Sequence, residues 1–387
     1  MKSNFKIKFI NHASLLIDDG TNKFLTDPWY ISPAFEGWVQ NPMPSYNDIK
    51  DIVINREKIN LIISHGHDDH LDDYFIKNYL NDTQIIISDF ESKGFYRRVS
   101  NLSNKLPLEI KQGINNSYEN NNINIYSFIN KFAGADNDSI LIICNNEEVI
   151  IHANDNYRVQ PDEIVEQIKL ISKNKFIYYF SQAGIASSFP INFSHYSDSE
   201  KKTIIHEENK RFIESFERNI ERIKPDLAFT YANQARFNFH HIVPYDDLIE
   251  QINKNSFIKQ LYPGDIILNQ ILERNTNKQD SINTVLLKKA EKLTNNYIKS
   301  KMNSEFKISF FIKDINVKLQ PIKNNIFFVA DTFTWSNILT GKQNLESILI
   351  GGLGEVIKLH EDNMREEAQL IGEFAYIFQN RETKKFF

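Results

Sequence analysis

Cysteine is nearly absent from this 387-residue sequence, which contains Cys144 alone. One cysteine cannot form an internal disulfide, and it excludes zinc or iron–sulfur sites built from several thiolates. Cys144 lies in an apolar stretch, where we expect an inert side chain in the core. This cysteine content suits a reducing compartment, so we expect a cytoplasmic protein.

Dense clusters of Lys and Arg and long apolar runs are also missing. The formal net charge is -5, which gives no broad attraction to phosphate backbones, so nucleic acid is not an expected partner. No apolar segment approaches the ~20 residues that cross a bilayer, and charged side chains interrupt residues 1–17 where a signal peptide would be apolar. We therefore expect no membrane span. Since nucleic acid is not an expected partner, we expect a small-molecule substrate.

The composition predicts a folded protein with a large core, since 41% of the residues are hydrophobic and 25% are charged. Residues 273–280 are polar and lack apolar anchors, which favours a domain boundary there. We therefore predict an α+β protein with a catalytic domain at 1–272 and a small C-terminal α+β domain of unknown role at 281–387.

Strand and helix patterns alternate along the first of these domains. A short β-branched run at 61–64 predicts a buried strand that leads directly into a histidine cluster. The remaining patterns predict strands at 5–17, 23–25, 84–88, 123–129, 139–144, 149–151, 227–231 and 266–268, and helices at 74–80, 161–172 and 200–224. In the C-terminal part we expect strands at 305–312 and 326–330, and helical segments from 335 to 352.

The cluster His65-Gly66-His67-Asp68-Asp69-His70 places three imidazoles and two carboxylates within six residues. His65 and His67 can point the same way from an extended segment. The following turn can aim Asp69 and His70 at a second point about 3.5–4 Å away, the spacing of a two-metal site. Burying such groups without a metal would be costly, so we predict a metal site.

This His-x-His-x-Asp-His motif resembles the signature of the metallo-β-lactamase superfamily, whose fold is a four-layer αβ/βα sandwich with a dinuclear metal site at one edge. The resemblance implies that His65 and His67 serve the first metal, and that Asp69 and His70 serve the second. It further implies a bridging carboxylate from Asp155 and a late histidine ligand from His240 or His241.

The sequence departs from the superfamily pattern at one ligand. A further histidine for the first metal is expected between His70 and the bridging Asp155, and none occurs from 71 to 151. Asp136 or Asp138 could substitute as a carboxylate ligand, the first metal could be weakly held or absent, or these residues form only a turn before the next strand.

Further segments narrow the resemblance to the catalytic domain of the CMP-N-acetylneuraminate hydroxylase family, over roughly residues 10 to 270. They are Thr26–Trp29, Pro33–Trp38, Ile63–Leu71 and Ala186–Ser194. The resemblance also implies that His12 lies near the site, that Asp27 orients a metal-bound histidine and that His195 meets substrate. We count Asp69, His12 and His195 as candidate catalytic residues.

Hydroxylases of that family carry a Rieske centre, which needs two cysteines and two histidines, so an oxygenase with this chain's single cysteine would take its electrons from a separate protein or from a co-substrate. We expect an iron-dependent oxygenase, with one or two iron ions, that acts on a polar substrate such as a nucleotide- or sugar-linked molecule. Histidine and carboxylate ligands also suit zinc or manganese. The alternatives are a metal-dependent hydrolase of a phosphodiester, lactone or amide, and a non-catalytic binding module.

Overall fold

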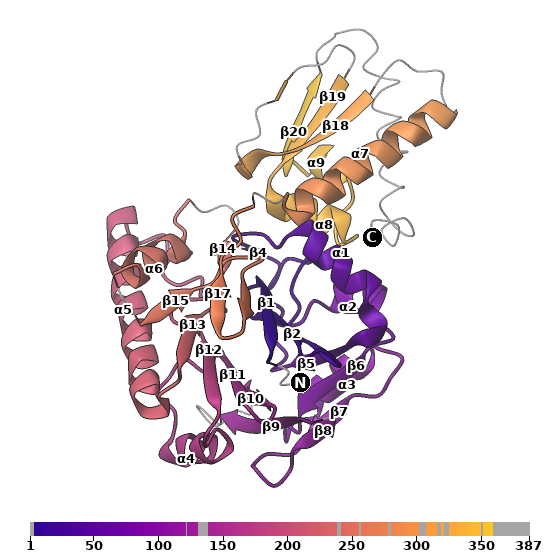
Figure 1. Cartoon of the computed structure of the whole chain (residues 1–387). Helices are drawn as coiled ribbons and strands as arrows, with labels where there is room; N and C mark the ends of the chain where they lie inside the picture. Colours follow the sequence, from indigo (N-terminus) through magenta and orange to yellow (C-terminus); the bar gives the residue numbers. More distant parts are fainter. Residues whose placement is uncertain are drawn as a thin grey trace.

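Two large β-sheets face each other in the computed structural model, and a third, smaller sheet lies beside them (Figure 1). The structure describes residues 4–120, 122–130, 138–237, 241–254, 257–277, 280–301, 307–315, 319–320, 325–349 and 351–358. Two predicted site residues, Asp136 and His240, lie outside these ranges.

The first sheet has eight strands in the order β17-β16-β1-β2-β3-β5-β6-β7. It mixes an antiparallel start with parallel pairs from β3 to β7. Its strands are β1 (Lys6–Asn11), β2 (Ser14–Asp18), β3 (Lys23–Thr26), β5 (Ile59–Ile63), β6 (Gln84–Ser88), β7 (Leu108–Ile110), β16 (Ile266–Leu268) and β17 (Ile271–Glu273).

The second sheet has seven strands in the order β15-β13-β12-β11-β10-β9-β8. These are β8 (Tyr118–Asn120), β9 (Ile123–Asn130), β10 (Asp138–Cys144), β11 (Glu148–Asn154), β12 (Phe176–Ser181), β13 (Leu227–Thr230) and β15 (Ile258–Gln260). A separate pair, β4 (Trp38–Gln40) and β14 (Ala235–Phe237), joins the loop after β3 to the segment after β13.

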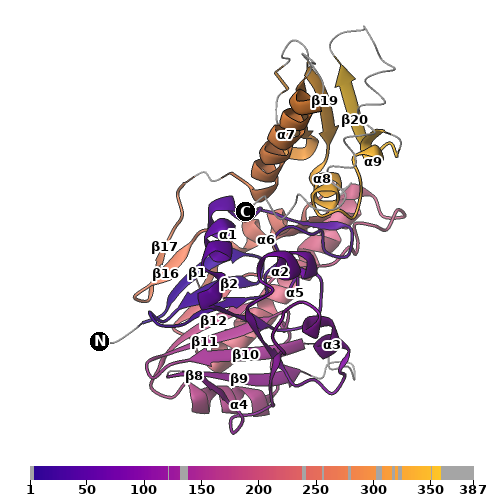
Figure 2. The ribbon, with the colours of Figure 1, turned by 90° about the vertical axis from the view of Figure 1, so that its right-hand side faces the viewer.

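Helices cover the outer face of each large sheet. Apolar residues of α1 (Tyr46–Ile54), α2 (Asp73–Tyr79) and α3 (Gly94–Ser100) pack with the first sheet, and those of α4 (Asp162–Ile171), α5 (Asp198–Ile223) and α6 (Pro244–Ile252) pack with the second. Figure 1 shows α5 and α6 on one side of the strands and α1 and α2 on the other, and in Figure 2 the side with α1 and α2 faces the viewer. A third apolar cluster lies between the sheets. The predicted four-layer αβ/βα sandwich is confirmed.

Strand β5 shows why both faces of the sheets are apolar. Leu61 and Ile63 pack on the helix side of the first sheet, and Ile62 between them packs against the second sheet. Successive side chains of a strand point to opposite faces, so a strand covered on both sides reads as a continuous apolar run. Its pairing with β3 and β6 leaves the histidine motif at the sheet edge, immediately after Ile63.

Most predicted elements of residues 1–272 are present within a few residues of their predicted ends. The single strand predicted at 5–17 was wrong: it is two antiparallel strands, β1 and β2, because the chain turns at His12, whose φ is 50°. Helix α5 begins with a capping box between Ser197 and Glu200, and it ends before Pro225 with Lys224 in a left-handed conformation. Helices α1, α3 and α6 were not predicted. Among the described helices, none is long and apolar enough to cross a bilayer.

The C-terminal part contains a three-stranded sheet of β18 (Lys307–Ile312), β19 (Asn325–Ala330) and β20 (Gly354–Lys358), with α7 (Ile282–Lys301), α8 (Thr332–Leu339) and α9 (Glu346–Leu349). Ile282 and Leu286 of α7 belong to the same apolar cluster as Ile49 of α1, and Lys289 bonds to Tyr46. The C-terminal part therefore packs on α1. The division into two domains stays a prediction.

Candidate metal centre

The candidate site lies where several strands end at one edge of the two large sheets. The histidine motif follows β5, Asp155 follows β11, and His12 lies in the tight turn between β1 and β2. Three residues here have left-handed backbone angles that side chains disfavour: His12 (φ 50°), Asp27 (φ 37°) and Asn154 (φ 41°). Strained backbone of this kind clusters at functional sites because the surrounding structure must hold it in place.

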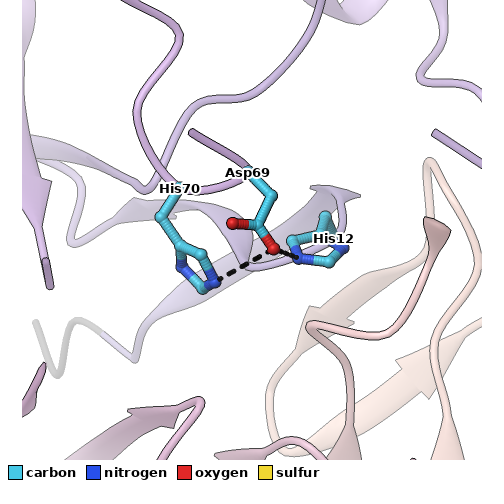
Figure 3. A group of neighbouring side chains, drawn as sticks. All are labelled: His12, Asp69 and His70. Atoms are coloured by element: carbon cyan, nitrogen blue, oxygen red, sulfur yellow. Dashed lines mark hydrogen bonds and ion pairs between the residues drawn. The ribbon is translucent and has the colours of Figure 1, made fainter. Parts of the chain in front are cut away.

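One group of possible metal ligands consists of His12, Asp69 and His70, which converge in Figure 3. Asp69 Oδ2 lies 3.2 Å from His12 Nε2 and 3.9 Å from His70 Nε2. All three side chains are buried. His12 is thus beside the motif although it is more than fifty residues away in the chain.

A second group consists of His65, His67 and Asp155. His65 Nε2 is 2.8 Å from His67 Nδ1, and Asp155 Oδ2 lies 3.7 Å and 3.9 Å from these two nitrogens. The other oxygen, Asp155 Oδ1, is 3.1 Å from His70 Nε2 in the first group. Asp155 therefore faces both groups, one oxygen to each, as a carboxylate bridging two metal ions would.

Hydrogen bonds behind the groups fix the orientation of the histidine rings. His70 Nδ1 is 2.9 Å from the carboxylate of Asp27, which also accepts from the backbone N–H and the hydroxyl of Ser64. His65 Nδ1 is 2.9 Å from Ser64 Oγ and 3.3 Å from Asp138 Oδ1. Because Nδ1 of each ring is engaged in this way, Nε2 is left to face the other candidate ligands.

The carboxylates and imidazoles of the site shift one another's pKa. Burial lowers the pKa of His70, but the carboxylates of Asp155 and Asp69 outweigh it and raise that pKa well above its usual value. Burial raises the pKa of Asp155, but His70 and His67 hold it well below its usual range. In the metal-free protein these shifts favour an ionised Asp155 beside a protonated His70.

The structure does not bring every predicted site residue into these groups. His195 is exposed in the loop before α5, where its ring lies 4.0 Å from that of Tyr196. His241 is exposed and pairs with Asp198 at 2.9 Å. Asp138, weighed as a replacement ligand, contacts the Nδ1 side of His65 and not the side that faces His67.

Two residues of the site's surroundings were missed from the sequence. His152 does fall between His70 and Asp155, but its ring nitrogens bond to Asp27 (2.9 Å) and to the Tyr231 hydroxyl (2.6 Å), so it belongs to neither group. Arg98 of α3 donates to the carbonyl of Gly66 and to Asp68, and thereby ties down the motif loop. An isolated arginine gives no sequence signal for such a role.

The chain is similar to cytidine monophosphate-N-acetylneuraminic acid hydroxylase from the mouse, with 24% identity over 270 residues. The match covers 66% of this chain and 43% of the mouse protein, less than half its length. No protein-family model matches the chain. The match agrees with the resemblance in the sequence motifs.

Solved structures with a similar course of the chain include several metal-dependent proteins. One is CmlA, a diiron β-hydroxylase from Streptomyces venezuelae (14% identity, 69% of this chain and 54% of that chain, TM-score 0.44). Another is the isothiocyanate hydrolase of Delia radicum gut bacteria (13% identity, 68% of this chain and 98% of that chain, TM-score 0.44). A third is the metallo-β-lactamase fold protein YhfI from Bacillus subtilis (11% identity, 68% of this chain and 98% of that chain, TM-score 0.42).

The donor groups at the sheet edge support a metal cofactor. The four layers, and the histidine motif placed directly after a central strand of one sheet, agree with the superfamily pattern that the motif predicts. The chain is a protein of the metallo-β-lactamase fold.

Proposed function

We propose that this chain is an iron-dependent oxygenase that hydroxylates a polar small molecule. The observation that carries the proposal is the composition of the two groups: His65, His67 and Asp155 in one, and His12, Asp69 and His70 in the other. Each offers two histidines and one carboxylate, the arrangement that non-haem iron oxygenases use with positions left open for dioxygen and substrate. In this proposal His12 takes the place of a late histidine ligand.

The candidate ligands are better satisfied by bound cations than by hydrogen bonds among themselves. Nδ1 of His70 faces Asp27, and its Nε2 faces Asp155, so without a cation the ring needs a second proton between two carboxylates. Nε2 of His65 and Nδ1 of His67 are 2.8 Å apart, so without a cation one of these two nitrogens must carry a proton and donate it to the other. Asp69 Oδ1 is buried and has no hydrogen-bond partner. A cation at each of the two groups would take the place of these protons.

Iron held by such ligands supplies the one-electron chemistry with dioxygen that hydroxylation requires. The chain's own residues then have distinct tasks. Asp155 would hold both ions through its two oxygens, and Asp27 keeps the Nε2 atom of His70 aimed at the site. With a single cysteine the chain offers no iron–sulfur relay, so the electrons come from a separate donor.

A cavity of about 430 Å³ beside the second group is the proposed substrate site. His67 and Asp155 lie in its wall, and the other side chains include Asn130, Gln182 and Ser187. Asn156 also lines it, is 4% exposed, and has an Nδ2 atom without a hydrogen-bond partner. The polar side chains of this wall support a polar substrate held next to the metal ligands.

A dioxygen-uptake experiment on iron-loaded protein tests the proposal. CMP-N-acetylneuraminate, on which the similar mouse protein acts by its name, is the first substrate to try, with a chemical reductant as electron source. We expect iron- and reductant-dependent uptake in the wild type, loss of bound iron and of uptake in Asp155→Asn, and retention of both in His206→Gln, whose ring is half exposed and pairs with Asp247.

Two results would overturn the proposal. The first is a protein that binds no iron. The second is turnover of a phosphodiester, lactone or amide by the zinc-loaded protein under anaerobic conditions, because a zinc-bound water performs hydrolysis without dioxygen. The latter result would assign the same ligands to a hydrolase.

A further inference from the structure

A chain of hydrogen bonds runs from the candidate metal centre into the space between the two sheets. His70 Nδ1 lies 2.9 Å from Asp27 Oδ2, His152 Nε2 lies 2.9 Å from the same oxygen, and the Tyr231 hydroxyl lies 2.6 Å from His152 Nδ1. All four side chains are fully buried, with 0% exposure. The chain links one sheet to the other, since Asp27 follows β3 whereas His152 lies on β11 and Tyr231 follows β13.

The direction of each hydrogen bond follows from the chemistry of the groups. An ionised carboxylate only accepts, so both His70 and His152 donate to Asp27. Donation from Nε2 leaves Nδ1 of His152 with a lone pair, which accepts the phenolic proton of Tyr231. The backbone N–H of Asn154 donates to the Tyr231 oxygen at 3.1 Å. The Tyr231 hydroxyl therefore both donates and accepts a hydrogen bond.

These contacts favour loss of an electron from Tyr231 together with its phenolic proton over loss of the proton alone. Burial, together with the charge of Asp27, raises the pKa of Tyr231 well above its usual value, so the phenol stays protonated. Removal of an electron makes a phenol strongly acidic, and a base already in hydrogen-bond contact can take the proton at once. The imidazolium so formed on His152 would be stabilised by Asp27.

We propose that Tyr231 is a redox-active residue that gives one electron to the metal centre when the centre has reacted with dioxygen in the absence of substrate. The Tyr231 O–H bond breaks, its proton forms an N–H bond at His152 Nδ1, and one oxidised iron ion of the centre gains the electron. Dioxygen is the ultimate oxidant. The inference rests on the proposed oxygenase function, and it gives the protein an internal electron for turnover without substrate.

Two other buried aromatic residues near the site lack such a base. The Trp29 ring lies 5.0 Å from that of His12, but its indole N–H donates to the carbonyl of Ser32, which cannot take up a proton. The hydroxyl of Tyr30 contacts the Ser14 hydroxyl. Tyr30→Phe is therefore a matched control for Tyr231→Phe, because each removes one buried hydroxyl.

The test mixes reduced, iron-loaded protein with dioxygen in the absence of substrate and freezes samples at intervals for electron paramagnetic resonance. We expect an organic radical whose hyperfine splitting collapses when the protein contains ring-deuterated tyrosine. The radical is lost in Tyr231→Phe and retained in Tyr30→Phe. It is also lost in His152→Gln, which keeps a hydrogen-bond acceptor but no base. Circular dichroism and iron content verify that each variant is folded and loaded.

Failure of this inference and failure of the proposed function give different results. If the iron is oxidised by dioxygen but no tyrosine radical forms, or the radical persists in Tyr231→Phe, Tyr231 is not the electron donor and the oxygenase proposal is unaffected. If the protein binds no iron, or reduced iron does not react with dioxygen, both proposals are wrong.

Discussion

Asp27→Asn tests how strongly the site depends on the carboxylate behind it. Asp27 is fully buried and accepts four hydrogen bonds, from the N–H and hydroxyl of Ser64, from His70 and from His152. Burial raises the pKa of Asp27, but His152 and His70 hold it well below its usual range, so the group is an anion. Asparagine has the same shape, yet its NH₂ group must face at least one of these donors.

The size of the effect of Asp27→Asn follows from the loss of the negative charge and of one hydrogen-bond acceptor. Hydrogen bonds to a charged group contribute about 1.5–3 kcal/mol each, so we expect the free energy of unfolding of the metal-free protein to fall by about 3 kcal/mol. Removing a carboxylate that orients a metal-bound histidine weakens metal binding by about 10–100-fold. Urea denaturation measures the first quantity, and competition with a chromophoric zinc chelator measures the second.

Asp265→Asn is the matched control for this experiment. Asp265 is 1% exposed and accepts hydrogen bonds from Tyr262, Arg274 and Asn275 near the start of β16, without contact to any candidate ligand. We expect this variant to lose stability and to keep its metal affinity. Equal metal affinity in Asp27→Asn and the wild type, with both proteins folded, would refute the role of Asp27.

Three further predictions concern the ligands themselves. His12→Ala removes a nitrogen from the group with Asp69, so metal content by mass spectrometry falls from two ions per chain to one; two retained ions would exclude His12 as a ligand. Metal must displace a proton from His70, whose pKa lies above the usual 6.5 in the metal-free protein, so zinc affinity rises with pH up to that pKa and then levels off. A pH-independent affinity would contradict this. His241→Ala keeps the full metal content, because its ring pairs with Asp198 away from both groups; loss of metal would contradict that placement.

The sequence predicted the parts of the site that are close together in the chain. The histidine motif follows an unmistakable apolar strand, and β11 delivers Asp155 to a loop, so both could be placed at strand ends. His12 could be placed near the site only through the resemblance to a family. Its approach to Asp69 depends on the pairing of β1 and β2 in the first sheet, which no local pattern encodes.

The connection from Asp27 to Tyr231 could not be predicted, because it joins residues of different sheets. His152 reads as one polar residue in an apolar strand, and its partners are defined only when the two sheets pack face to face. Helices α1 and α6 were missed since each lies close to a proline and follows a loop. Short amphipathic segments of this kind are fixed by the sheets they cover.

Metal content of protein purified without added metal or chelator is the most direct test of the central claim. The proposed oxygenase function predicts two iron ions per chain, one at each group of ligands, with an electronic absorption band from ligand-to-metal charge transfer in air that is lost on reduction. Zinc as the only bound metal, with no band and no response to reductant, would contradict the oxygenase account.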